Sequence, residues 1–105
     1  MSDSIVSYLE AHLDDYLADL RYLVGIDSGT YDKAGVDAVQ DWLGAQLARL
    51  GFTVERRRQA KWGDDLVARR TGNGRARIML LGHADTVYPA GTAARRPLTL
   101  VGDWL

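Results

Sequence analysis

The sequence has no cysteine, only two prolines and a single phenylalanine among its 105 residues, and it lacks any long apolar run. Without cysteine, disulfides and thiolate metal sites are both excluded. No segment approaches the roughly 18 consecutive apolar residues that span a bilayer, so we expect no membrane partner. No basic stretch precedes an apolar one at the N-terminus, which predicts no secretory signal peptide. These absences favour a cytoplasmic protein.

Charge is distributed unevenly along a chain whose net charge is only −1. Residues 1–55 contain 3 basic and 10 acidic side chains, whereas residues 56–105 contain 10 basic and 4 acidic ones. A nucleic-acid surface is one interpretation of the basic half. Ordinary solvated strand faces are the other, and we favour it because no nucleic-acid-binding motif accompanies the arginines. We therefore expect no nucleic-acid partner.

Apolar residues recur at three- and four-residue steps in two segments, which predicts helices over residues 4–24 and 34–50. Ser4 is the expected N-cap of the first helix, and His12 is expected on its surface, outside any metal site. Asp32 is the expected N-cap of the second helix. Gly51 follows that helix and is expected to close it in the left-handed conformation of a Schellman motif.

After Gly51 the pattern changes to that of strands, predicted over residues 52–58, 65–70 and 75–82. The Asn-Gly pair within residues 71–74 favours a hairpin that would make 75–82 antiparallel to its predecessor. A further strand is expected over residues 98–101. The predicted fold class is α/β, with two helices packed on a mixed sheet.

The most informative segment is residues 78–89, which read I-M-L-L-G-H-A-D-T-V-Y-P. The apolar run predicts a strand buried on both faces, and His83 and Asp85 follow it directly. Residues i and i+2 of an extended chain project to the same side. A neutral imidazole is a good zinc ligand, and a carboxylate can fix its orientation. A histidine hydrogen-bonded to a local aspartate at a strand end is the alternative explanation.

This string resembles the first metal motif of the di-zinc exopeptidases and deacylases, the family of glutamate carboxypeptidase, acetylornithine deacetylase, succinyl-diaminopimelate desuccinylase and aminoacylase. Further segments resemble the family in order and spacing, so that the likeness covers nearly the whole chain: L-V-G-I-D-S-G-T (23–30), G-F-T-V-E (51–55), G-D-D-L-V-A (63–68) and R-P (96–97). The resemblance implies that His83 is a metal ligand and that Asp85 is the catalytic-site carboxylate that orients it. Ser28 and Thr30 either line the cleft or cap a local turn.

The resemblance also implies a function for the complete protein. It would hydrolyse an amide in a small peptide or N-acyl amino acid, with two zinc ions for which cobalt or manganese could substitute, and it would form a homodimer. Residues 1–105 would be the N-terminal portion of the catalytic domain, the remaining ligands, the general base and the dimerisation domain lying beyond Leu105. Residues that bind substrate are unknown from this sequence. A non-catalytic α/β module or truncated remnant that acts only in binding is the alternative.

Overall fold

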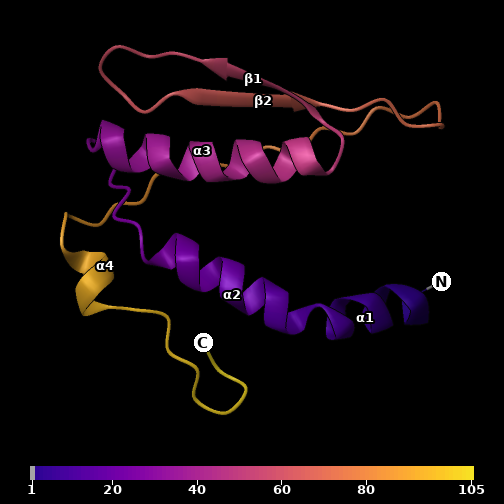
Figure 1. Cartoon of the computed structure of the whole chain (residues 1–105), viewed down its shortest axis with the longest axis horizontal. Coiled ribbons are helices and arrows are strands. Elements are labelled where there is room, and N and C mark those ends of the chain that lie inside the picture. Colours follow the sequence, from indigo (N-terminus) through magenta and orange to yellow (C-terminus); the bar gives the residue numbers. More distant parts are fainter. Residues whose placement is uncertain (1) are drawn as a thin grey trace. The chain divides into compact units, whose positions relative to one another are not determined.

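In the computed structural model, which describes residues 2–105, helix α3 (Lys33–Arg49) lies against an antiparallel hairpin of β1 (Thr53–Arg57) and β2 (Asp65–Arg69) (Figure 1). The register pairs Thr53 with Arg69 and Arg57 with Asp65. These elements belong to one compact unit, Asp27–Ala90. The prediction of a second helix followed by two strands is confirmed.

The ends of α3 follow the rules that predicted them. The side chain of Asp32 accepts a hydrogen bond from the amide of Gly35 at 2.9 Å, which confirms it as the N-cap. At the other end Gly51 has φ of +87°. Its amide donates to the Ala48 carbonyl, and the Phe52 amide donates to the Leu47 carbonyl. These two bonds form the expected Schellman motif.

Val36 and Val39 of α3 are the buried apolar side chains of the core. Gly63, in the turn before β2, packs so closely on Val36 that a Cβ atom at position 63 would overlap the valine side chain. The turn can therefore approach the helix only if residue 63 has no side chain.

Replacing Gly63 by alanine is expected to lower the free energy of unfolding by about 1–3 kcal/mol, because the added methyl overpacks the core. Chemical denaturation followed by circular dichroism measures this change. Gly72→Ala is the matched control, since a Cβ there meets no atom within 4 Å. An equal effect of the two substitutions would contradict this packing.

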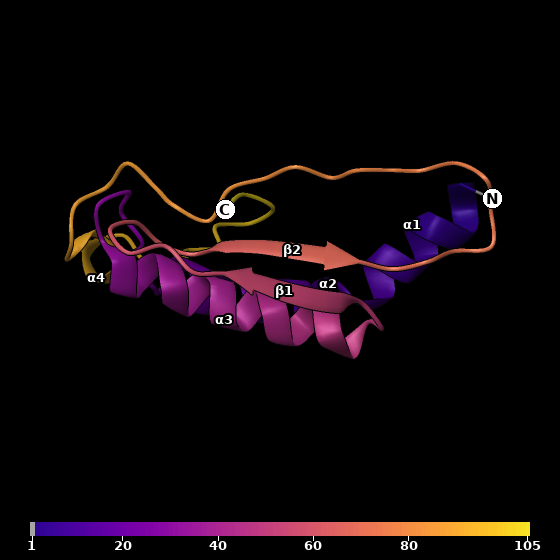
Figure 2. The same ribbon diagram turned by 90° about the horizontal axis from the view of Figure 1, so that it is seen from above.

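The prediction of a third strand over residues 75–82 is wrong. The segment runs as a plain trace without a partner, and the sheet has only the two strands β1 and β2 (Figure 2). Its apolar side chains are almost fully accessible, from 84% for Met79 to 93% for Leu80. A strand buried on both faces needs paired neighbours and cover on each side, and the described residues supply neither. The predicted mixed sheet is therefore replaced by an antiparallel hairpin.

The second unit contains the residues up to Ile26 together with Gly91–Leu105. The single helix predicted over 4–24 is instead two, α1 (Ser2–Ala11) and α2 (Leu13–Val24), so Ser4 lies within α1 and is not its N-cap. The break occurs at His12, whose Nδ1 lies 2.7 Å from the carbonyl oxygen of Tyr8 and whose ring stacks on Tyr8. His12 has φ of −109° and ψ of 12°, outside the helical range, and its side chain shares the Tyr8 carbonyl oxygen with its own amide.

The C-terminal part of this unit has little regular structure. It contains the short helix α4 (Thr92–Arg95) and an antiparallel bridge between Val101 and Trp104. The strand predicted over 98–101 is thus reduced to that bridge. Within residues 2–105, no helix is both long enough and apolar enough to cross a membrane.

Candidate active site

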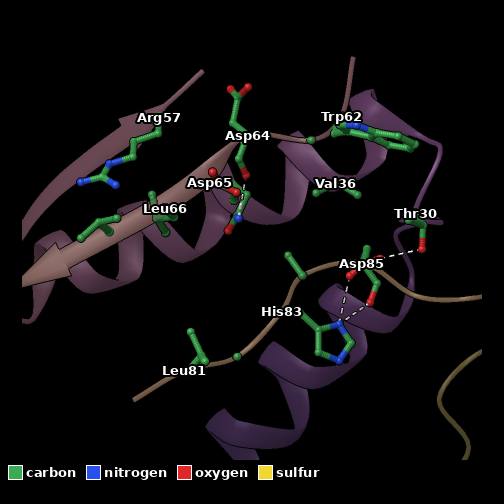
Figure 3. Close-up of a pocket in the computed structure, with 15 residues that line it drawn as sticks. Thr30, Val36, Arg57, Trp62, Asp64, Asp65, Leu66, Leu81, His83 and Asp85 are labelled. Carbon is green, nitrogen blue, oxygen red and sulfur yellow. Dashed lines mark hydrogen bonds and ion pairs between the residues drawn. The ribbon is translucent and has the colours of Figure 1, made fainter. Parts of the chain in front are cut away.

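His83 and Asp85 lie together, as the i and i+2 spacing predicted (Figure 3). Nδ1 of His83 is 3.1 Å from Oδ1 of Asp85 and 2.9 Å from the Asp85 carbonyl oxygen. Both neighbours can only accept when the carboxylate is ionised, so Nδ1 carries the proton. The lone pair of a neutral imidazole is then on Nε2. The His83 side chain is 81% exposed, which leaves Nε2 accessible to a ligand.

The carboxylate of Asp85 has a second partner, which comes from far along the sequence. Thr30 donates from Oγ1 to Oδ2 of Asp85 at 2.6 Å. This bond, followed by the contact with His83, holds the pKa of Asp85 below its ordinary value of 3.8. Asp85 is therefore ionised at neutral pH and able to accept a hydrogen bond from the Nδ1–H group of His83.

The backbone holds Thr30 in place beside Asp85. Gly29 and Thr86 form a parallel bridge, in which the amide of Thr86 donates to the carbonyl of Ser28 at 2.8 Å and the amide of Thr30 donates to the carbonyl of Thr86 at 3.0 Å. Ser28 is buried, with only 4% of its surface accessible. The structure thus brings the Thr30 side chain to the site, whereas Ser28 is buried and contributes its main-chain carbonyl to the bridge with Thr86.

A cavity of about 500 Å³ adjoins the pair, and its lining includes Thr30, Trp62, Asp64, Leu66, His83 and Asp85 (Figure 3). These residues come from the loop before α3, the turn before β2, strand β2 itself and the segment after the unpaired run. Trp62 was not singled out from the sequence, because a tryptophan in a turn has no distinctive spacing. Its ring packs against Tyr31, with 5.3 Å between the centroids.

One wall of the cavity is fixed by a buried ion-pair cluster around Asp64, which sequence reasoning missed. The Asp64 carboxylate is fully buried and contacts Lys33 at 2.8 Å, Arg56 at 3.1 Å and Arg58 at 3.3 Å. It also accepts from the amide of Gln59 at 2.8 Å. Hydrogen bonding to Lys33, and then to the Gln59 amide, holds the pKa of Asp64 far below its ordinary range.

Ion pairs within the protein, in this cluster and beside it, engage several of the arginines in the basic half of the sequence. Arg56 also pairs with Asp41 at 2.7 Å, while Arg57 and Arg69 both pair with Glu55. Lys33, Asp37 and Asp41 are spaced by four residues and thus share one face of α3, a signal that could have located the cluster. These arginines are engaged in ion pairs within the protein.

The residues that the structure describes contain no group of three or more histidine, cysteine, aspartate or glutamate side chains placed to hold a metal ion. His83 offers one ligand atom of the right chemistry, an imidazole nitrogen whose ring is directed by a carboxylate. The donor set therefore fits one position in a zinc coordination shell and leaves the others to be supplied elsewhere.

No protein-family model matches the chain. The chain is 41% identical to Carboxypeptidase G2 of Pseudomonas sp. (strain RS-16) over 86 residues, which are 80% of this chain and 21% of that protein. This likeness supports a carboxypeptidase G2-like peptidase family. The chain spans about a fifth of the length of this relative.

Proposed function

We propose that the complete protein carrying this sequence is a zinc-dependent hydrolase that cleaves an amide bond next to a free carboxylate, in a small peptide or N-acyl amino acid. The main support for this proposal is the His83–Asp85 pair beside a cavity, with the proton of the His83 imidazole on Nδ1 and with Nε2 accessible. The likeness to a carboxypeptidase supports the reaction class. Two zinc ions and a homodimer complete the proposal and come from the family resemblance. A cytoplasmic location is proposed from the lack of cysteine.

In this proposal His83 would hold zinc through Nε2, and Asp85 would keep the imidazole in the tautomer that leaves this nitrogen free. Bound zinc would polarise the substrate carbonyl and lower the pKa of a water molecule toward neutrality. The chain's own residues position the groups. The ionised Asp85 would accept a hydrogen bond from Nδ1 of His83, and the cavity beside the pair would give the substrate access to His83.

The complete protein is expected to cleave at least one member of a panel of N-acyl-glutamates, N-acetylornithine, succinyl-diaminopimelate and simple dipeptides. N-acyl-glutamates are the expected preferred substrates, because the string G-H-A-D-T-V-Y-P most resembles the glutamate carboxypeptidase branch, which favours acidic leaving residues. The assay measures release of the free amine with zinc, cobalt or manganese present. If every substrate survives with all three metals, the hydrolase proposal fails and a non-catalytic binding module takes its place.

A further inference from the structure

Thr30 makes the shortest side-chain hydrogen bond around the candidate site, although 55 positions separate it from its partner. Its hydroxyl oxygen is 2.6 Å from Oδ2 of Asp85 and 3.2 Å from the carbonyl oxygen of Thr86. A hydroxyl has one proton to donate, and a bond to an ionised oxygen is both shorter and stronger than one to a neutral carbonyl. The proton therefore goes to Asp85.

The two oxygens of Asp85 are divided between two partners. Oδ2 accepts from Thr30, while Oδ1 faces Nδ1 of His83 at 3.1 Å and shares this nitrogen with the Asp85 carbonyl oxygen at 2.9 Å. The Asp85 side chain is 35% exposed, so water competes for any oxygen that the protein does not hold. Without the threonine hydroxyl, the carboxylate could rotate and turn Oδ1 away from the imidazole.

Backbone hydrogen bonds hold Thr30 beside Asp85. Its amide donates to the Thr86 carbonyl, and the Thr86 amide donates back to Ser28. Between them Gly29 approaches the backbone of Tyr88 so closely that a Cβ atom would lie 2.8 Å from its carbonyl oxygen. The loop before α3 is thus attached to the segment that carries Asp85.

We propose that Thr30 is a positioning residue that acts on His83 through Asp85, by holding the carboxylate in the rotamer that keeps the imidazole proton on Nδ1. The proposal deepens the proposed function, because the oriented imidazole is the expected zinc ligand. Residues that orient a metal-binding histidine typically change metal affinity or activity by about 10–100-fold when removed.

The test compares Thr30→Val, which removes the hydroxyl and keeps the branched shape, with Thr30→Ser, which retains the hydroxyl. In the complete protein Thr30→Val is expected to lower the affinity for zinc, measured by competition with a chelator, by about tenfold. It is expected to lower kcat/KM by about the same factor. Thr30→Ser is expected to restore both to near the wild-type values. Thr99→Val is the control, because that hydroxyl donates only locally, to the Pro97 carbonyl.

A cycle with Asp85→Asn separates positioning from a general structural role. If Thr30 acts through Asp85, adding Thr30→Val to Asp85→Asn should cause little further loss. The tautomer of His83, read from nitrogen-15 chemical shifts of the metal-free protein at alkaline pH, gives a result that needs neither zinc nor substrate. Nδ1–H is expected to dominate in wild type and Thr30→Ser, with a smaller excess of this tautomer in Thr30→Val, where only the Asp85 carbonyl oxygen of the two acceptors would still hold the proton.

An unchanged tautomer in Thr30→Val overturns the positioning role, whatever the activity. So does a Thr30→Ser variant as impaired as Thr30→Val, or losses that add fully to those of Asp85→Asn. A wild-type protein that binds no zinc and cleaves no substrate, yet shows the expected tautomers, would instead reject the proposed function and leave the role of Thr30 in orienting His83 intact.

Discussion

Replacing His83 by alanine in the complete protein is expected to reduce kcat/KM by about a thousandfold or more, with loss of bound zinc. If His83 holds zinc as proposed, the metal would supply several kcal/mol of transition-state stabilisation, and each 1.36 kcal/mol is tenfold in rate. His83 is the residue among those described whose accessible imidazole nitrogen is directed by a carboxylate. Metal content by mass spectrometry and steady-state kinetics measure the two effects.

The other histidine of the chain supplies the matched control. His12 is exposed at the break between α1 and α2, where its ring contacts Tyr8. His12→Ala removes the same side chain and should leave zinc stoichiometry and kcat/KM near wild type. Equal zinc content in the His83→Ala and wild-type proteins, with equal turnover, would refute the assignment of His83 as a ligand.

Local signals in the sequence were sufficient to predict α3 and the two strands that follow it, although not the pairing of these strands with each other. Asp32 satisfies an amide at the N-terminus of α3, and Gly51 takes the positive φ that other residues avoid, so each boundary follows from a nearest-neighbour interaction. The i and i+2 geometry of His83 and Asp85 is equally local. For this reason both the helix and the candidate pair could be predicted without knowledge of the tertiary structure.

Features that depend on distant partners could not be predicted in this way. The apolar run at residues 78–81 has the composition of a buried strand, yet pairing depends on neighbouring strands that sequence periodicity does not specify. The contact of Thr30 with Asp85 joins residues 55 positions apart. The burial of Asp64 requires Lys33, Arg56 and Arg58 to converge from a helix and from the segment around β1. Each of these depends on tertiary packing.

Replacing Asp64 by asparagine is expected to be the most destabilising single change in the unit Asp27–Ala90, lowering its Tm by on the order of 10 °C. Lys33 and Arg56 would keep their contacts with Asp37 and Asp41, but the buried acceptor that joins Lys33, Arg56 and Arg58 would lose its charge. Hydrogen bonds to a charged group contribute more to stability than those to a neutral one. The same carboxylate joins the turn that carries Trp62 to the start of α3, since Lys33 also donates to the Trp62 carbonyl. Thermal unfolding followed by circular dichroism measures the change.

The effect should depend on pH in a direction set by the depressed pKa of Asp64. A carboxylate whose pKa is lower in the folded than in the unfolded state stabilises the fold at pH values above its ordinary value of 3.8. That contribution is lost as the pH falls from there toward the lower folded-state pKa. The wild-type Tm should therefore be nearly constant near neutrality and fall in acid, whereas Asp64→Asn should show a shallower fall. Some acid sensitivity should persist, because Asp37 also has a lowered pKa, caused first by the Asp64 amide and then by Lys33.

The neighbouring aspartate separates burial from charge. Asp65 is exposed and accepts from the side chain of Gln59 at 2.9 Å, so Asp65→Asn removes an identical charge one position away without disturbing a buried cluster. Exposed interactions of this kind contribute little to stability, and we expect its Tm and its acid profile to match wild type within a few degrees, about the effect of a surface substitution. If both variants unfold at the same temperature, or if Asp64→Asn retains the full acid dependence, the cluster does not hold the fold together, and the wall of the cavity beside His83 must be fixed by packing against Val36 instead.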